Sequence, residues 1–431
     1  MPEPVSQAPP SSRSRRRLTC GLFLVVIILG AVMLALMLGQ QPRESGQEQS
    51  QQHSDETSAE PVCRADGHFV AGFMSPQRDD EATEELLAQM NADAVTFGGR
   101  IMPSDAEQYP AEVAEAIGDR DVYDYTVDMN WDGITLSEAD QLIQVGETEY
   151  GLIAATENAV VMTASESGAD VFHSLTRTAS QRENNAYIGL PIPQMRTAGE
   201  PWLPDNSYAD VVDGFAEKFV AAYHERGADG FYLAMEMPLT DVAHWDPVTD
   251  YYQRQTAMIN DVSPGATVLI SPYLEGRTDR ETITPATAAA GYQKLLDLHN
   301  GTHVLVAPQD GVGVGTTALE ADESAAHRYS VEDYFAALHE VDPENLYVTI
   351  EAMQSGDGPD AREPTTRDRI EQQLDATAPY VQGAIGYQWS GPTAMTTIDH
   401  IGEGACSVGP GELNSATSTF TPSGLTCSLG L

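Results

Sequence analysis

The sequence has very little positive charge. Only 22 of its 431 residues are Lys or Arg, against 65 Asp and Glu, and lysine occurs only at Lys218 and Lys294. The formal net charge is therefore -43. A surface of this sign repels the phosphates of nucleic acids and of anionic lipids, so neither is an expected partner. A solvated acidic surface explains the composition, whereas a cation-binding surface finds no support in any metal-ligand spacing.

Motifs that would indicate several other chemistries are also missing. The ten histidines include no His-Glu-x-x-His and no obvious ligand pair on one face, which argues against a zinc site. No Gly-x-Ser-x-Gly elbow is present, which weakens an α/β-hydrolase interpretation. The glycines of Gly311–Gly315 are spaced as Gly-x-Gly-x-Gly without a following Lys-Ser/Thr, so they do not predict a nucleotide site. We expect neither a metal nor a cofactor.

Cysteine is scarce, with four residues in the chain. Cys20 lies in an apolar run near the N-terminus, so three thiols remain in the rest of the sequence. These allow one disulfide and leave one cysteine over. A Cys406–Cys427 bridge would close a loop in the C-terminal tail, and a bridge from Cys63 to the tail would join the two ends of the domain. Both pairings stay open, and a structural role is expected for either.

One long apolar run is present. Leu18–Gly39 carries no charge, follows four arginines between Arg13 and Arg17, and is long enough to span a hydrocarbon core of about 30 Å. Its length and the lack of a small-x-small cleavage site favour a signal anchor over a cleaved signal peptide, which would give a secreted protein. The positive residues predict a cytoplasmic tail over 1–17 and a domain outside the cytoplasm. Residues 40–62, rich in Gln, Glu and Ser, read as a polar linker to a domain over 63–431.

Short apolar runs alternate with helical patterns through this domain. Strands are expected at His68–Met74, Ala92–Gly98, Asn185–Pro191, Gly230–Glu236, Ala266–Tyr273, His303–Gln309, Leu346–Glu351 and Val381–Trp389. Helices are expected at Asp80–Asn91, Tyr208–Arg226, Pro247–Asn260, Pro285–Leu298, Ser330–Glu340 and Thr366–Ala376. Eight strands with intervening helices predict an α/β fold, a (β/α)8 TIM barrel, rather than an open doubly wound sheet.

One segment is too long for a single βα unit. Ile101 to about Asn184 separates the second and third expected strands. It contains a helical pattern at Ser137–Val145, apolar runs at Tyr150–Ala155 and Ala159–Thr163, and a helix near Ala169–Ser180. We therefore expect an insertion after strand two, on the active face of the barrel.

Two glutamates end expected strands. Glu236 closes the fourth run and Glu351 closes the seventh. An unpaired carboxylate is costly to bury, so both are expected at the carboxyl ends of their strands, facing a cleft. Two carboxyl groups in one pocket are what glycosidic bond hydrolysis needs, one to protonate the departing oxygen and one to attack or to activate water. Each glutamate alone would suit a structural ion pair equally well.

Other polar and aromatic residues follow the same strand ends. Sugars present both hydroxyl groups and apolar C–H faces, which hydrogen-bonding side chains and aromatic rings recognise. Gln309 and Asp310 are candidates for contacts with sugar hydroxyls, and Arg100 for orienting a carboxylate or hydroxyl. The candidate aromatic residues are Trp245, Tyr273, Tyr387 and Trp389. For each of these, ordinary packing or a structural ion pair is the alternative.

Three stretches resemble the bacterial domain-of-unknown-function family 4434, which is similar to glycoside hydrolases of the large (β/α)8 clan. They are Gly230–Pro238, Ser263-Pro264-Gly265 leading into Val268–Tyr273, and Ala307–Gly315; Glu351 with Ala352 also fits. The resemblance covers about Gly67 to Trp389. It implies a glycosidase-like barrel with Glu236 as acid/base and Glu351 as nucleophile.

We therefore predict an extracytoplasmic glycoside hydrolase that acts on a polysaccharide by a retaining mechanism. In this hypothesis Glu236 is held protonated by partial burial and Glu351 stays ionised. A non-catalytic glycan-binding or envelope-assembly module on the same barrel is the main alternative. A metal-dependent esterase or deacetylase is a third, which the lack of a ligand cluster disfavours.

Overall fold

A computed structural model describes most of the expected domain. The described residues are 69–77, 80–90, 92–127, 138–165, 170–193, 206–280, 283–321, 326–355 and 361–390. The predicted tail, anchor and linker lie outside these ranges, as do Cys63, Cys406 and Cys427. Across the part of the chain that is described, no helix is both long and apolar enough to cross a bilayer.

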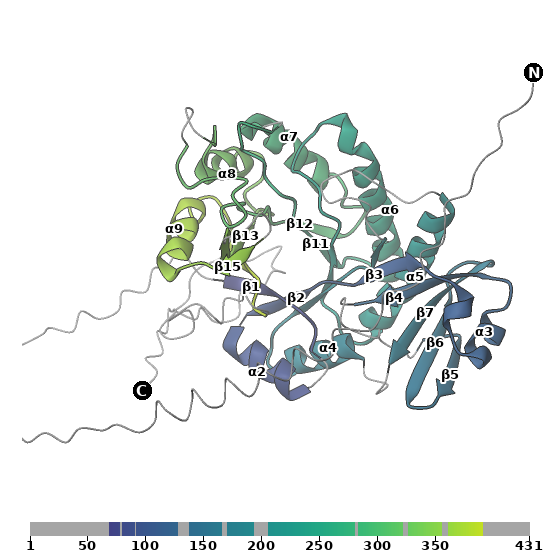
Figure 1. Ribbon diagram of the computed structural model, residues 1–431. Helices are drawn as coiled ribbons and strands as arrows, with labels where there is room; N and C mark the ends of the chain where they lie inside the picture. The colour runs from purple at the N-terminus through teal and green to yellow at the C-terminus, as the bar shows by residue number, and fades with distance from the viewer. Residues whose placement is uncertain are drawn as a thin grey trace, which may run out of the picture. The chain divides into compact units, whose positions relative to one another are not determined.

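Eight parallel strands form the central sheet (Figure 1). In spatial order they are β12 (His303–Val306), β11 (Thr267–Ile270), β10 (Gly230–Leu233), β8 (Ala186–Gly189), β2 (Asp93–Thr96), β1 (Phe69–Met74), β16 (Ala384–Tyr387) and β13 (Val348–Glu351). Most of their residues are buried, because such strands have protein on both faces. All eight predicted strands are present, and each is shorter than its apolar run.

The sheet curls until its two outer strands meet. Val306 of β12 accepts a hydrogen bond from the Tyr347 amide (2.9 Å), and further along Thr349 donates to Pro308 and accepts from Asp310 (both 2.9 Å). One buried cluster draws side chains from every strand or its immediate approach, including Phe73, Tyr232 and Tyr347, and so fills the interior. The arrangement is therefore of the TIM-barrel kind, with a packed centre.

Helices follow the strands along the chain and pack on the outer face of the sheet. They are α2 (Asp80–Met90), α4 (Val171–Gln181), α5 (Asn206–Glu225), α6 (Asp246–Val262), α7 (Pro285–Leu296), α8 (Val331–His339) and α9 (Arg367–Thr377). Local sequence sets several starts: Ser330 and Asp333 form a capping box at α8, and Thr284 caps α7 before Pro285. A second, larger apolar cluster lies between these helices and the sheet.

The long segment after β2 forms a sheet of its own. Its strand order is β5 (Gln141–Val145), β6 (Thr148–Ala154), β7 (Ala159–Ser165), β4 (Asp121–Thr126), β3 (Arg100–Pro103) and β9 (Ile192–Pro193). The chain reaches α3 (Ala111–Ile117) through the short helix η1 (Ala106–Gln108), and α3 packs an apolar cluster against this sheet. The predicted insertion is therefore present. It lies at the carboxyl end of the barrel, because β3 and β9 directly follow β2 and β8.

One secondary-structure prediction in this insertion is wrong. The helix expected at Ser137–Val145 is instead the edge strand β5, paired antiparallel with β6. A tight turn at Gly146, with φ of 63°, joins the two strands, and such a turn lets this short apolar run pair immediately with its successor.

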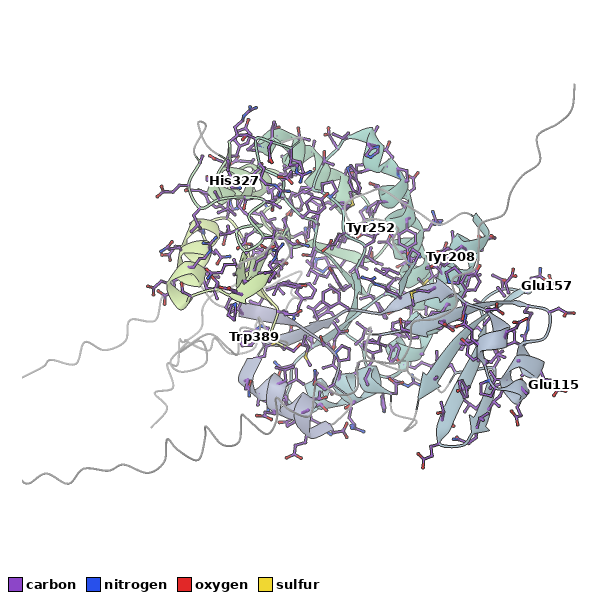
Figure 2. The ribbon with its side chains drawn as sticks, viewed as in Figure 1. Glu115, Glu157, Tyr208, Tyr252, His327 and Trp389 are labelled. Atoms are coloured by element: carbon purple, nitrogen blue, oxygen red, sulfur yellow. The ribbon has the colours of Figure 1, made fainter. Side chains whose placement is uncertain are left out.

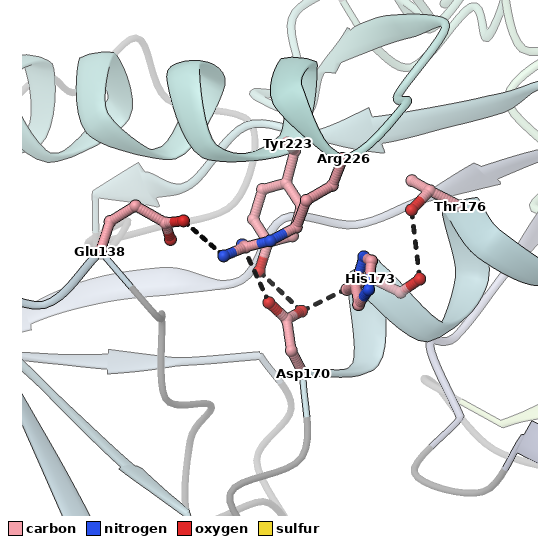
Figure 3. Close-up of polar contacts among 6 residues, drawn as sticks. All are labelled: Glu138, Asp170, His173, Thr176, Tyr223 and Arg226. Carbon is pink, nitrogen blue, oxygen red and sulfur yellow. Dashed lines mark hydrogen bonds and ion pairs between the residues drawn. The ribbon is translucent and has the colours of Figure 1, made fainter.

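A partly buried ionic network ties the insertion to the helices (Figure 3). Asp170 caps α4 by accepting the His173 amide at 3.0 Å, and it also accepts the Tyr223 hydroxyl at 2.9 Å. Arg226, just beyond α5, pairs with Asp170 at 3.1 Å and with Glu138 before β5. The Arg226 side chain thus joins three segments far apart in the sequence.

Candidate active site

Glu236 and Glu351 emerge at the same end of the barrel. Glu236 follows β10, the fourth strand of the ring, by three residues, and Glu351 is the last residue of β13, the seventh. Because all eight strands run parallel, both residues lie at the carboxyl edge of the sheet. The segment before Glu236 is anchored by Tyr252 of α6, whose hydroxyl donates to the Met235 carbonyl (Figure 2 labels Tyr252).

Glu236 reaches solvent, although protein surrounds it on most sides. That surrounding protein raises the pKa of its carboxyl group above the ordinary value. A hydrogen bond from the Gln309 side chain and the positive charge of Arg100 act in the opposite direction. The structure thus brings together three predicted site residues from different parts of the chain, with Arg100 supplied by the first strand of the insertion.

Glu351 has a very different environment. It is only 2% exposed, and its Oε2 accepts a 2.7 Å hydrogen bond from the Val314 amide. Burial, followed by the negative charges of Asp310 and Glu236, raises its pKa to about 8. Burial and neighbouring negative charge thus act against the ionised form that the sequence led us to expect for Glu351.

Asp310 is fully buried beside Glu351. Its Oδ2 accepts a hydrogen bond from Gln373 Nε2 at 2.5 Å, and its Oδ1 accepts the amides of Val312 at 3.2 Å and Glu351 at 3.4 Å. Burial raises its pKa to about 7. The expectation that Asp310 contacts sugar hydroxyls is not met, because the side chain turns inward and has no exposed surface.

Tyr387 is paired with Glu351 from the neighbouring strand β16. Burial and then the charges of Glu236 and Glu351 raise its pKa to about 12, and its ring packs on Phe73 with centroids 5.6 Å apart. Tyr273 is half-buried and lies between neighbouring strand ends, where its amide donates to Met237 at 3.0 Å and its backbone pairs with Gln309. Both tyrosines therefore stand at the predicted end of the barrel.

The two predicted tryptophans are packing residues. Trp389 is 5% exposed and meets Phe69 edge-on, with ring centroids 6.0 Å apart (Figure 2). It fills the space left by Gly72, where a Cβ would lie 2.0 Å from the indole Cδ1. Trp245, in the short helix η2 (Ala243–Trp245), is 8% exposed and belongs to the same outer cluster. Neither offers a face to a sugar, which corrects that prediction.

The glycine-rich stretch after β12 covers Glu351. Gly311 and Gly315 have φ of 69° and 77°, a backbone conformation that favours glycine. A Cβ on Gly313 would lie 2.6 Å from Glu351 Cβ and 2.9 Å from its Oε2. Glycine is required at 313 because the loop backbone lies directly against the glutamate side chain.

Sequence reasoning missed Gln373 of α9, which is fully buried and donates to both Asp310 Oδ2 and the Glu351 carbonyl. A signal was available, because Gln373 shares a helix face with Ile370, Leu374 and Thr377, and a polar residue at such a position calls for a buried partner. Within the described ranges, no three His, Cys, Asp or Glu side chains are grouped so that they could hold a metal ion.

Several solved structures are similar to this chain at low sequence identity. A candidate alpha-L-fucosidase from Bacteroides thetaiotaomicron VPI-5482 is 14% identical, with a TM-score of 0.49 over 82% of this chain and 94% of its own. The PgaB (BpsB) glycoside hydrolase domain from Bordetella bronchiseptica is 10% identical, with a TM-score of 0.37 over 74% and 93%. A GH138 enzyme targeting pectin rhamnogalacturonan II is 11% identical, with a TM-score of 0.38 over 74% and 38%. These likenesses decide neither the substrate nor the chemistry of this chain.

No curated protein matches the sequence. A family match does exist, and it spans more than half of the 431 residues and includes both glutamates, although it begins inside β6 and not near Gly67 as expected. Over residues 154–395 the chain belongs to the family described as "Domain of unknown function (DUF4434)".

Proposed function

We propose that this protein is a glycoside hydrolase with a (β/α)8 barrel, and that Glu236 and Glu351 are its two catalytic carboxyl groups. The observation that carries the proposal is their shared environment at the carboxyl end of the barrel. Glu236 is open to solvent beside Gln309 and Arg100, and Glu351 lies close enough for the charge of Glu236 to raise its pKa. The charges of both glutamates also raise the pKa of Tyr387.

We expect such a pair to hydrolyse a glycosidic bond with net retention. One carboxylic acid protonates the glycosidic oxygen while the other carboxylate bonds to the anomeric carbon, and water then releases the sugar. Gln309, Arg100 and the two tyrosines supply the polar and aromatic contacts that a carbohydrate needs. We expect a polysaccharide or oligosaccharide as substrate, and no step calls for a metal or a cofactor.

The test is turnover of a panel of polysaccharides and aryl glycosides by the purified protein and its variants. Glu236→Ala and Glu351→Ala should each lower kcat by about a thousandfold while the affinity for the glycan is kept. Glu363→Ala, on the exposed strand β15 (Arg362–Pro364), is the matched control and should leave turnover unchanged. Proton NMR of the first product should show the anomeric configuration of the substrate.

A wild-type protein that binds a glycan and never cleaves it would refute the catalytic proposal. It would favour the glycan-binding or envelope-assembly module instead. Inversion of the anomeric carbon would keep the hydrolase and refute the retaining mechanism, because a water must then enter between the two carboxyl groups.

The proposed location outside the cytoplasm rests on the sequence alone. The arginines before Leu18–Gly39 and the length of that apolar run support a single-pass anchor with the barrel outside. Fractionation of cells that express the full chain tests it: the protein should sediment with membranes and be digested by protease added to intact spheroplasts. Recovery of an intact protein from the soluble cytoplasm would refute it.

A further inference from the structure

We propose that Asp310 and Gln373 act as a buried positioning pair that keeps the shared proton of the site on Glu351. Glu351 would then be the proton donor and Glu236 the attacking carboxylate, which reverses the roles implied by the family resemblance. This inference rests on the proposed hydrolase function and deepens it.

The orientation of Gln373 is fixed by its neighbours. Its Nε2 lies 3.1 Å from the Glu351 carbonyl oxygen and 2.5 Å from Asp310 Oδ2. A flipped amide would set its oxygen against a carbonyl oxygen, which has no proton to donate. The NH2 group of Gln373 therefore faces Asp310, and Asp310 Oδ2 must accept.

The other oxygen of Asp310 is also an acceptor. Oδ1 meets the backbone amides of Val312 and Glu351, neither of which can accept a proton. Arg369 of α9 adds a nearby positive charge that favours the ionised form of Asp310. Three N–H groups and one guanidinium thus stabilise Asp310 as a carboxylate, although it is fully buried.

Glu351 has less support for a negative charge. Its Oε2 accepts the Val314 amide, and the Gly313 amide also favours its ionised form, but the negative charges of Asp310 and Glu236 act against that form. Tyr387 is paired with Glu351 from the neighbouring strand β16. Two adjacent carboxyl groups in a water-poor interior cannot both ionise at neutral pH. We therefore place the proton on Glu351, which has two amide donors, whereas Asp310 has three N–H donors and a nearby guanidinium.

Glu236 has the complementary environment. It is open to solvent, and the Gln309 amide and the Arg100 guanidinium both favour its ionised form. When the surroundings of two carboxyl groups differ in this way, the more solvated one stays charged and the buried one keeps its proton. Glu236 is therefore the carboxylate of the pair, and Glu351 is the protonated acid.

With these roles, hydrolysis proceeds in two steps through a glycosyl ester of Glu236. A Glu236 oxygen bonds to the anomeric carbon as the glycosidic C–O bond breaks, and the Glu351 proton passes to the leaving oxygen, which departs as an alcohol. Glu351, now a carboxylate, takes a proton from water as that water attacks the same carbon. The ester to Glu236 breaks, and Glu351 has regained its proton.

Infrared titration tests the position of the proton without any substrate. The full-length wild-type protein should show a carboxylic-acid C=O band that persists to about pH 8 and is lost in Glu351→Gln. In Asp310→Asn the band should remain, with its midpoint lowered by about one pH unit or more because a neighbouring charge is gone. Glu363→Gln, an exposed control, should behave as wild type.

Loss of the band in Asp310→Asn would overturn the proposal, because the proton would then belong to Asp310. If Asp310→Asn does not fold, Gln373→Met provides the second test, since it removes the donor that holds Asp310 ionised. In that background Glu351→Gln should no longer abolish the band, and its abolition would count against the role of Gln373.

Azide rescue tests the reversed roles on any dinitrophenyl glycoside that the wild-type protein cleaves. With azide, Glu236→Ala should yield a glycosyl azide of inverted configuration and Glu351→Ala one of retained configuration. The opposite pattern would restore the roles implied by the family. If no glycoside is cleaved, the hydrolase proposal fails, and the infrared titration still decides where the proton is.

Discussion

Replacing Glu351 by Gln should stabilise the protein at alkaline pH and leave its stability almost unchanged in acid. The amide has the shape of the protonated carboxyl group and cannot ionise. In the wild type, burial together with the charge of Asp310 raises the pKa of Glu351 from 4.5 to about 8. Because folding raises the pKa of Glu351, its protonated carboxyl group stabilises the folded state in full below about pH 4.5. This stabilisation is lost as the pH rises through about 8.

The size of the effect follows from the shift. A displacement of about 3.5 pKa units corresponds to about 5 kcal/mol in full, and about 4 kcal/mol of this is lost between about pH 5 and pH 9. Solvent screening reduces the figure little, because Glu351 is 2% exposed. Relief of Asp310, whose own pKa burial raises to about 7, should add to the gain of the variant.

Urea unfolding at about pH 5 and pH 9 measures this difference. At each pH, the free energy of unfolding of the wild type is subtracted from that of the variant. This difference should be about 4 kcal/mol larger at pH 9 than at pH 5. The general repulsion of an acidic chain cancels, since both proteins are compared at the same pH. Glu363→Gln, on an exposed strand, should show no such trend. An equal difference between variant and wild type at both pH values would refute the reasoning.

Three further predictions follow from the packing. Gly313→Ala places a methyl group 2.6 Å from Glu351 Cβ. The value of kcat should therefore fall at least about tenfold, and the free energy of unfolding by about 1–3 kcal/mol. Normal turnover would contradict this and show that the loop moves freely. Arg226→Ala leaves the partly buried Asp170 without its cation and should cost about 2 kcal/mol in urea unfolding. Arg254→Ala removes an ion pair with Asp213 in which the Arg254 side chain is half exposed, and should cost under about 1 kcal/mol; equal losses would contradict this. Trp389→Ala should destabilise the protein by about 4 kcal/mol without changing glycan affinity, and a selective loss of binding would mean that the indole does touch sugar.

The insertion contributes to the site. Its first strand, β3, begins at Arg100, whose charge acts on Glu236. The sequence suggested an elaborated loop on the active face, and the structure shows a separate sheet with its own apolar cluster. A stable sheet holds a cation more rigidly than a loop would, because the β3 backbone is paired on both sides by β4 and β9.

The local sequence pattern was sufficient to predict the strands and the strand ends at which Glu236 and Glu351 lie. An apolar run that ends in a carboxylate predicts a strand whose last residue leaves the core, since an unpaired buried charge is costly. The same rule failed to distinguish the two glutamates. Glu236 is open to solvent, whereas Glu351 is covered by the loop around Gly313, and nothing in the seven residues before either one differs in a way that would reveal this.

The alternation of strands and helices, the acidic composition and the two glutamates at strand ends could all be predicted from the sequence, because each depends on residues close together in the chain. The surroundings of each side chain depend on long-range packing. That packing buried Asp310 beside Glu351, brought Gln373 from a distant helix to face both, and packed Trp389 over Gly72. The charge of a carboxyl group depends on the dielectric and the donors within a few ångströms, and those come from segments that only the closed barrel places side by side.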